Sequence, residues 1–405
     1  MPCQVCANVR PELFLDLGAQ PACIFPTSRE QFKTEKRYPL AVYFCPDCSL
    51  VQIGKPVDQS VLFGEDYHHI AALSSSFRSH LELLAKNTVM QFGLGREDLV
   101  VELGSNDGAL LEAFIPHDVK VLGVDPSDVA EIAIKNRIDT IRAFFDEKLA
   151  DKLMRSHGKA AAILAINTFA HVTHLDTFVR GVYNLLTNDG VFVSESHYVL
   201  DLIEGLQYDF IYHEHSRYSS VRTLVELFGK HGLEVFDVER IPTHSGSIRV
   251  FAGHKGTHGV SKRVGELLAG ERAFGLDKSE TYHRLAHEVI VHKEVFTEFL
   301  KAIKAAGHSI AGLTFPARAV TLLNYGGIGP ETLDCITELS TLKIGRWSPG
   351  THIPVVDQQV LFGKDAPDYG LLLSWHIAGE IIPRFRAKGF KGKFIIPLPT
   401  PRIVE

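Results

Sequence analysis

The chain has 405 residues, of which 45% are hydrophobic and 22% charged, and its formal net charge is −6. This length exceeds what one hydrophobic core usually holds, so two or three domains of an ordinary globular protein are expected. The acidic balance argues against the basic stripe of a nucleic-acid-binding protein, and no apolar run approaches the roughly 20 residues that span a bilayer. The N-terminus lacks the basic start and apolar core of a secretory signal. We therefore expect a cytoplasmic protein with neither nucleic acid nor membrane as a partner.

Two cysteine pairs lie in the first part of the chain, Cys3-x-x-Cys6 and Cys45-x-x-Cys48. Each pair can bring two thiolates to one tetrahedral ion, and two pairs complete a closed, structural zinc site with no open position for catalysis. The alternative is four unrelated buried thiols. The paired spacing in a segment with little apolar material favours zinc. We therefore predict a zinc-binding domain over residues 1–65.

Helix and strand patterns alternate through the middle of the chain. A helical period over 76–92 precedes a strand, a glycine turn and a helix over 98–114. Further strands and helices are expected at 119–125, 160–167, 175–186, 190–196, 221–232, 233–241 and 247–253. This rhythm is typical of a parallel, doubly wound sheet, here placed in a domain of residues 66–255. A helical connection over 256–307 and a second, smaller α/β domain over 308–405 complete the prediction.

The glycine turn, 100-VVELGSNDGALL-111, carries ligand-binding features. Glu102 ends the strand, Gly104 and Gly108 flank Asn106, and glycines let the backbone approach a ligand at a helix N-terminus. Asp125 ends the next strand, where a carboxylate can accept both hydroxyls of a ribose. The pattern lacks the three-glycine fingerprint of dinucleotide sites and looks like the S-adenosylmethionine (SAM) site of class I methyltransferases. A turn that binds no nucleotide is the alternative.

The sequence YHEH, Tyr212 to His215, concentrates titratable groups. A metal interpretation is disfavoured because adjacent residues of an extended segment point to opposite faces, while a helix would need histidines four residues apart. In an extended segment Tyr212 and Glu214 would share one face, and His213 and His215 the other, although a turn would change this. A polar turn without function is the alternative. With His171 after the strand 161–167, the stretch predicts an acid/base centre.

Together these motifs resemble the sugar C-methyltransferases of deoxysugar biosynthesis. The similarity is carried by the cysteine pairs, the SAM turn, 167-NTFAHV-172, 209-DFIYHEHSRYSS-220, 235-VFDVERIPTHSGSIRVF-251 and 345-GRWSPGTHIPV-355. It covers essentially the whole chain in the same order. The resemblance implies a zinc-binding N-terminal domain, a central Rossmann-like SAM domain, and a C-terminal Rossmann-like domain. A nucleotide-linked 4-keto-6-deoxyhexose would be held between them and methylated at C3.

The resemblance also implies roles for individual residues. His215 is the general base that removes a proton next to the ketone, with Tyr212, Glu214, His171 and Tyr67 near the reacting sugar. The cofactor site comprises Glu102, Gly104, Asn106, Gly108, Asp125 and Asn167. Substrate contacts are expected from the polar cluster that contains His244, Ser247 and Arg249. The enolate would be stabilised by phenol or imidazole donors, because one such donor contributes roughly 3 kcal/mol.

Three departures from the family pattern bear on the C-terminal domain. The glycine-rich, lysine-containing turn reads 313-LTFPARAVTLL-323, with Arg318 in place of the lysine. An aspartate-rich strand end reads 336-ITELST-341, and a Gly-Gly after His244 reads Ser245-Gly246. They leave the nucleotide and the sugar open.

Alternative functions are C5 methylation, epimerisation or ketoreduction of a related nucleotide sugar. A ketoreductase would need the nicotinamide fingerprint that the sequence lacks. An RNA-modifying methyltransferase is disfavoured by the acidic charge, and a SAM-dependent protein without catalysis would leave YHEH without a purpose. Either a monomer or a dimer is compatible with the sequence.

Overall fold

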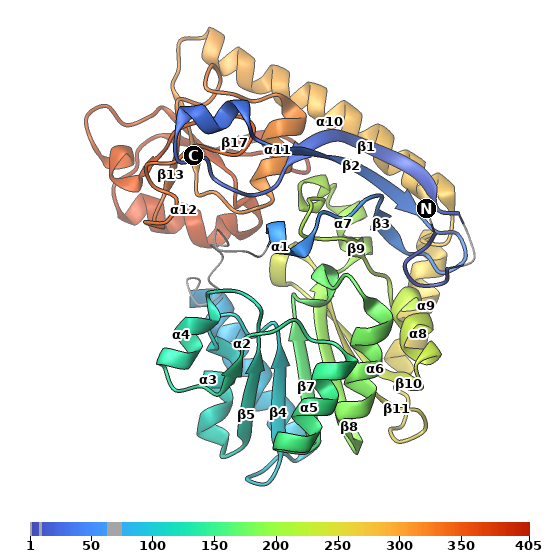
Figure 1. Cartoon of the computed structure of the whole chain (residues 1–405). Coiled ribbons are helices and arrows are strands. Elements are labelled where there is room, and N and C mark those ends of the chain that lie inside the picture. The colour runs from blue at the N-terminus through green and yellow to red at the C-terminus, as the bar shows by residue number, and fades with distance from the viewer. Residues whose placement is uncertain (1, 8–9, 63–74) are drawn as a thin grey trace.

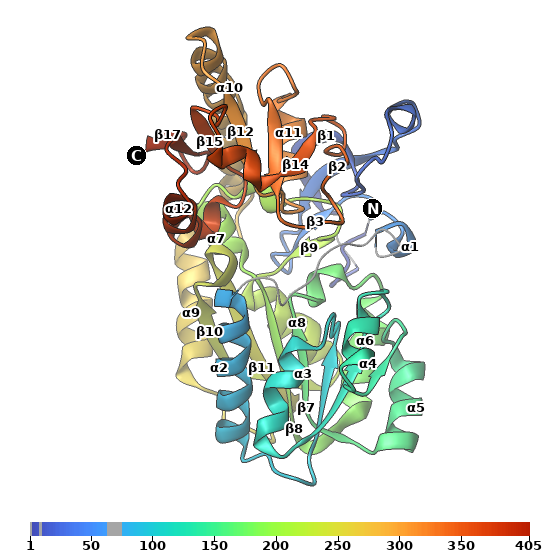
Figure 2. The same ribbon diagram turned by 90° about the vertical axis from the view of Figure 1, so that its left-hand side faces the viewer.

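The computed structural model describes residues 2–7, 10–62 and 75–405, and Tyr67 falls outside them. Three sheets organise these residues (Figures 1 and 2). Figure 1 shows the seven-stranded sheet in the lower lobe, and the N-terminal and C-terminal sheets in the upper part of the molecule.

The central sheet has the strand order β10-β11-β8-β7-β4-β5-β6. Its strands are β4 (Leu99–Leu103), β5 (Lys120–Val124), β6 (Thr140–Ile141), β7 (Ala160–Ile166), β8 (Leu186–His197), β10 (Leu233–Ile241) and β11 (Ser247–His254). Only β11 runs against its two neighbours, and the other pairs are parallel. The predicted doubly wound sheet is confirmed.

Alternating side chains bury both faces of this sheet. Val100 and Leu164 pack with α2 (Ser75–Phe92) and α3 (Ala109–Phe114) in one core cluster. Val101 and Ile163 lie in the cluster on the other face, which includes side chains of α5 (Glu147–His157), α6 (Leu175–Leu185) and α8 (Val221–Lys230). Since successive strand residues point to opposite faces, continuous apolar runs such as AAAILAI suit a sheet covered on both sides. The short helices α4 (Ala130–Lys135) and α7 (Val199–Glu204) follow β5 and β8 in the chain.

The N-terminal sheet has the order β1-β2-β3-β9. Strands β1 (Glu12–Pro21), β2 (Arg37–Phe44) and β3 (Val51–Ile53) come from the cysteine-containing segment, which ends with α1 (Gln59–Leu62). Strand β9 (Arg217–Tyr218) comes directly after YHEH and pairs with β3. The N-terminal sheet is thus completed by residues from the middle of the chain, and the core of this region is continuous with that of the central domain.

The C-terminal sheet has the order β14-β13-β12-β15-β16-β17. Its strands are β12 (Ile310–Leu313), β13 (Cys335–Glu338), β14 (Val355–Asp357), β15 (Tyr369–Leu372), β16 (Lys393–Ile396) and the antiparallel β17 (Arg402–Val404). Helix α11 (Ala319–Gly326) follows β12 and α12 (Ala378–Ala387) follows β15. The predicted second, smaller α/β domain is confirmed by this largely parallel sheet.

Two helices, α9 (Lys262–Phe274) and α10 (Ser279–Ala305), occupy the predicted helical connection. In both views the long α10 runs beside β1, and it ends where the C-terminal domain begins (Figures 1 and 2). Glu271 of α9 is buried and accepts hydrogen bonds from the Tyr198 hydroxyl at 2.8 Å and from the backbone N–H of Arg222 at 3.1 Å. Through this carboxylate the connection is fastened to the first turn of α8. Among the described residues, no helix combines the length and apolarity that a membrane span requires.

The departure Ser245-Gly246 has a local explanation. A Cβ on Gly246, whose φ is +124°, would lie 2.1 Å from Cγ of Asp201, so glycine is required there. Ser245 has a φ of +67°, in the left-handed region that favours glycine. The serine therefore keeps the backbone path of the turn at the expense of local strain.

Candidate active site

The carboxyl ends of the parallel strands of the central sheet place the predicted cofactor residues side by side. Gly104 follows β4, Asp125 follows β5 and Asn167 follows β7. Asn106 and Asn167 both adopt positive φ, 50° and 54°. Ligands of open α/β sheets bind at this edge, where the strand-to-helix turns leave backbone donors exposed.

The glycines keep the turns close together. A Cβ on Gly104 would meet the side chain of Thr168 at 2.3 Å, and one on Gly108 would meet Ile138 at 2.7 Å. The requirement for glycine therefore comes from packing of the neighbouring turn and helix, because these side chains fill the space that a Cβ would need.

Three carboxyl groups converge at this edge. The Asp125 carboxylate accepts hydrogen bonds from the backbone N–H of Asn106 at 2.9 Å and from the hydroxyl of Ser127 at 2.6 Å. Glu102 is buried, and its Oε2 has no hydrogen-bond partner among the described residues. Burial, together with the charges of Asp125 and Asp107, raises the pKa of Glu102 well above its ordinary value. This concentration of negative charge suits a cationic ligand.

The YHEH stretch forms a turn. The backbone N–H of His215 donates to the carbonyl of Tyr212 at 3.0 Å, so the first and fourth residues come together. The Tyr212 hydroxyl lies 3.1 Å from Nε2 of His215. His213 points elsewhere, because its Nε2 lies 3.2 Å from the carbonyl oxygen of Gln20 in the N-terminal domain. The turn thus separates the two histidines and places His215 with the phenol.

His215 is buried beside a second imidazole, and the centroids of its ring and that of His171 are 4.9 Å apart. Burial lowers the pKa of His215 well below its ordinary value of 6.5, and His171, His197 and His244 act in the same direction. Its Nδ1 has no hydrogen-bond partner among the described residues. At neutral pH this ring is therefore unprotonated and able to accept a proton.

The backbone of Glu214 orients the second imidazole. Nδ1 of His171 lies 2.7 Å from the Glu214 carbonyl oxygen, which can only accept, so this nitrogen carries a proton. The Glu214 carboxylate makes no hydrogen bond to either ring among the described residues. Burial raises its pKa to about 7, opposed by the charge of Lys343. The phenol of Tyr212, rather than this carboxylate, is the side chain that orients His215.

The segment before the turn is held by the C-terminal domain. Asp209 is fully buried and pairs with Arg318 through two contacts of 2.7 Å, one from Nε and one from Nη2. The indole N–H of Trp375 donates to the same carboxylate at 2.8 Å. The hydroxyl of Thr321 in α11 donates to the carbonyl of Ile211 at 2.7 Å. Arg318, which departs from the family's lysine, is therefore part of the contact that positions YHEH.

The residues expected to contact substrate lie in different surroundings. The ring of His244 lies 6.4 Å from Phe210 and 6.3 Å from His376. The Ser247 hydroxyl donates to the carbonyl of Thr243 at 3.0 Å. Arg249 forms ion pairs with Glu195 at 2.5 Å and with Glu239 at 3.0 Å, so its charge is already balanced. Substrate contacts by these three residues stay a prediction.

The structure adds residues that the sequence patterns did not single out. His197, the last residue of β8, stacks on Phe210 with ring centroids 3.9 Å apart. His376, four residues after the end of β15, meets the same phenyl ring edge-on, with ring centroids 6.4 Å apart. The only sign of these two residues in the sequence is that each stands at the carboxyl end of a strand. That sign could be used for His376 only once the pairing of β12 with β15 was known.

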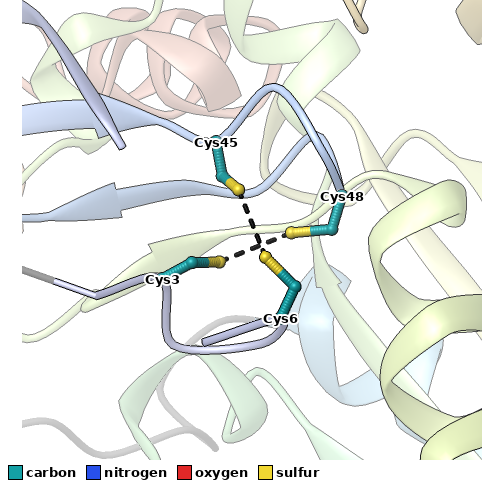
Figure 3. A group of neighbouring side chains, drawn as sticks. All are labelled: Cys3, Cys6, Cys45 and Cys48. Atoms are coloured by element: carbon teal, nitrogen blue, oxygen red, sulfur yellow. Dashed lines mark hydrogen bonds between the residues drawn. The ribbon is translucent and has the colours of Figure 1, made fainter. Parts of the chain in front are cut away.

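The four cysteines form one cluster (Figure 3). Their sulfur atoms all lie within 4.8 Å of one another, with Cys3 to Cys48 at 3.5 Å and Cys6 to Cys45 at 3.4 Å. These spacings fit four thiolates around one ion at about 2.3 Å per bond. The hydrogen bond from Cys48 lowers the pKa of the Cys3 thiol to about 5, a direction that favours the thiolate form that a metal binds.

Comparisons with known proteins cover the whole chain. Family models match in three consecutive parts, described as "Putative zinc binding domain" over residues 3–63, "Methyltransferase domain" over 77–238 and "C-methyltransferase C-terminal domain" over 242–399. The chain is 36% identical to "C-methyltransferase NovU" of Streptomyces niveus over 376 residues, which are 92% of this chain and 89% of that protein.

Two solved methyltransferase structures each match less than half of this chain. A SAM-dependent methyltransferase from Archaeoglobus fulgidus gives a TM-score of 0.35 at 13% identity, covering 43% of this chain and 93% of that one. The magnesium protoporphyrin IX methyltransferase of Synechocystis, with bound SAM, gives 0.33 at 12% identity, covering 44% and 79%. With the family models and the curated relative, the strand order and the cysteine cluster identify this chain as a member of the SAM-dependent C-methyltransferase family with an N-terminal zinc-binding domain.

Proposed function

We propose that this protein transfers a methyl group from SAM to C3 of a nucleotide-linked 4-keto-6-deoxyhexose, with His215 as the general base. The observation that supports the proposal most directly is the position of His215. It is a buried, unprotonated imidazole that lies with Tyr212 and His171 beside the SAM-binding edge of the sheet. The resemblance of the sequence motifs to the deoxysugar enzymes supports the sugar class.

The chemistry follows from the ketone. A proton on the carbon next to a carbonyl is acidic because the resulting charge moves to the carbonyl oxygen, and a neutral imidazole can accept this proton. When bound, SAM supplies an electrophilic methyl group for the carbon of the enolate. The Tyr212 hydroxyl lies close enough to His215 to act as a hydrogen-bond donor to the enolate oxygen, whereas the Nδ1 proton of His171 is already given to the Glu214 carbonyl.

The hydrogen bond to Tyr212 can form with either tautomer of His215, and only one of them leaves a nitrogen free to act as base. If Nε2–H donates to the phenol oxygen, the lone pair of Nδ1 is free to take the substrate proton. In the other tautomer Nδ1 carries the proton and the phenol O–H donates to the Nε2 lone pair. The ring then has no nitrogen free to accept a proton from the substrate. Proton abstraction therefore uses Nδ1, the nitrogen that has no partner among the described residues.

The edge residues suit SAM as the cofactor. Asp125 has acceptor capacity left after its bonds to Asn106 and Ser127, and so can accept ribose hydroxyls. Glu102, with its free Oε2 and raised pKa, suits the ammonium or sulfonium charge of SAM. Three carboxyl groups that repel one another become compatible once a cation lies between them.

Zinc in the cysteine cluster would be structural. With four sulfur ligands the ion is closed to substrate. The cluster is tied to the active-site turn, because the hydroxyl of Thr223 donates to the Cys48 carbonyl at 2.8 Å and Arg217 of β9 donates to the side chain of Gln4 at 2.9 Å. The ion would therefore fix the segment that follows His215.

The function is tested by incubating the protein with SAM and a panel of TDP-, CDP- and GDP-linked 4-keto-6-deoxy sugars. We expect one of them to gain the mass of one methylene, with the new methyl group on C3 by NMR of the product. A product methylated at C5 would correct the position. No turnover of any keto sugar, with SAM bound normally, would contradict the proposal.

Replacing His215 with alanine should abolish turnover while leaving SAM affinity nearly unchanged, because the ring lies in the YHEH turn, next to Tyr212 and His171, and not among the residues predicted to hold SAM. The wild-type rate should show no loss near pH 6.5 and fall only at lower pH, since burial lowers the pKa of His215. Steady-state rates over pH and SAM calorimetry measure both effects. His283→Gln, an exposed imidazole on α10, is the matched control, and turnover in His215→Ala would remove this residue as the base.

SAM binding should release a proton from Glu102, because a cation next to this carboxyl favours its ionised form. The affinity for SAM should then rise with pH until Glu102 is ionised in the free protein. Calorimetry in buffers of different ionisation enthalpy counts the released proton. Glu102→Gln should weaken binding about tenfold and remove the proton release, whereas the exposed Glu97→Gln should do neither. An unchanged proton release in Glu102→Gln would show that another group titrates.

Metal analysis of the purified protein should give about one zinc per chain. Cys45→Ser should lose the ion and lower the unfolding temperature, because the cluster supports the sheet that β9 completes. Cys23→Ser, at a cysteine outside the cluster, is the matched control and should keep the metal. If the wild-type protein contained no zinc and unfolded at the same temperature as Cys45→Ser, the assignment of a zinc site to the cysteine cluster would be refuted.

A further inference from the structure

Arg217 of β9 is a buried cation without a carboxylate partner. It is only 2% exposed, and it forms no ion pair with a carboxylate of the described residues, whereas the buried Arg249 and Arg318 are each paired with one. Burial lowers the pKa of Arg217 to about 9, so its guanidinium stays charged at neutral pH. An unpaired charge inside a protein is costly, so its presence here calls for an explanation.

The side chain of Arg217 joins two segments that lie far apart in the sequence. Its Nε donates to the side-chain oxygen of Gln4 at 2.9 Å, and its Nη1 donates to the backbone carbonyl of Phe169 at 3.0 Å. Gln4 belongs to the loop of residues 3–6, here called the first cysteine loop (Figure 3). Phe169 begins the one-turn helix η4 (Phe169–His171). One guanidinium therefore connects the first cysteine loop to the turn that carries His171.

The η4 turn is also bonded to the residue that follows YHEH. The backbone N–H and the hydroxyl of Ser216 both donate to the Ala170 carbonyl, at 3.0 Å and 2.9 Å. Since Ser216 stands between His215 and Arg217, the segment 215–217 and the η4 turn are joined at consecutive residues, and a shift of one must move the other. The separation of the His171 and His215 rings, 4.9 Å between centroids, depends on this joint.

Three cations from the middle of the chain donate to residues that stand between paired cysteines. Arg217 reaches Gln4, Lys230 of α8 reaches the Val5 carbonyl at 2.5 Å, and Arg222 of α8 reaches the Asp47 carbonyl at 2.6 Å. Four thiolates around one Zn²⁺ leave two net negative charges on the cluster. Positive groups near such a centre stabilise it and are stabilised by it in return. A loaded cluster would therefore offset part of the cost of burying Arg217.

We propose that Arg217 is a positioning residue that fixes the His171 turn to the first cysteine loop, so that the metal site sets the geometry of the His171–His215 pair. The inference rests on the proposed function for the roles of these two histidines. Arginine suits the task because its planar fork presents N–H groups in fixed directions, here one toward each segment. The ammonium of a lysine offers no such fork.

The link is tested first on zinc affinity, measured on the full-length protein by competition with a chromophoric chelator. Arg217→Gln and Gln4→Leu should each weaken zinc binding roughly tenfold, because either change breaks a hydrogen bond to a charged group. The double variant should bind zinc no more weakly than Arg217→Gln, since the contribution of Gln4 runs through Arg217. Arg180→Gln, at an exposed arginine on α6, is the control and should bind zinc like the wild type.

The second readout is the pH profile of turnover. Arg217→Gln, loaded with zinc, should turn over roughly tenfold more slowly, because the two imidazoles are no longer held together. The acidic limb of its profile should move to higher pH. The charge of His171 helps to keep the pKa of His215 low, and a loosened turn weakens this effect and raises that pKa. A change in overall stability alone would leave the limb in place.

Thermal unfolding accompanies each measurement, so that a misfolded variant is recognised. Gln4→Leu, at a partly exposed position, keeps the test decisive where Arg217→Gln does not fold. Additive losses of zinc affinity in the double variant, unchanged zinc affinity in both single variants, or an unmoved acidic limb in folded, zinc-loaded Arg217→Gln would each overturn the proposal. The zinc titration needs no sugar substrate, so failure of the proposed methyl transfer and failure of this link give distinct results.

Discussion

The buried pair between Asp209 and Arg318 is the interaction on which the arrangement of this protein depends. It joins residues 109 positions apart, at the junction of the central and C-terminal domains. Removing two charges from water is expensive, and such a pair is stable only when the geometry is good and the other lone pairs are satisfied. Here the contact is bidentate, and the Trp375 indole takes a further lone pair of the carboxylate. Burial of one partner alone would leave an uncompensated charge, so the two domains hold each other in one relative position.

The YHEH turn, which we propose as the catalytic centre, is held in place from two sides. The C-terminal domain holds residues 209–211, and the N-terminal domain holds His213 through Gln20 and residues 217–218 through the pairing with β3. Tyr212 and His215 lie between these supports. A base that removes a weakly acidic proton must be held close to the productive geometry, and such support comes best from packed neighbours. Each of the three domains therefore contributes to the position of His215, although the central domain alone carries it.

The sequence predicted the parts of the molecule that depend on short-range pattern. Strands such as 160–166 follow from continuous apolar runs, helices such as 175–185 from apolar periodicity, and the turn around Gly104 from its glycines and the acidic strand ends. The cysteine cluster followed from spacing. By contrast, β1 was missed, because Gly18, Pro21 and two register irregularities interrupt its alternation. The two-residue strand β9 has no period that could be recognised.

For the candidate site, the sequence could not predict that YHEH forms a turn. An extended reading pairs Tyr212 with Glu214, whereas the turn pairs Tyr212 with His215 and directs His213 into another domain. His197, Arg318 and His376 all lie near the Phe210 ring, although they stand at or after the ends of three different strands that are far apart in the chain. Tertiary packing decides such contacts, and neither periodicity nor spacing carries that information.

Strand β9 has a consequence for how the protein is made. The N-terminal sheet needs residues 217–218, so the N-terminal segment cannot complete its own sheet until these residues have been synthesised. Until then the edge of β3 is open, a state that invites pairing with other chains. Closing this sheet late in synthesis joins the first and middle parts of the chain in one cooperative unit. The three parts recognised by family models are therefore not interchangeable modules, and their boundaries are poor places to cut or exchange the chain.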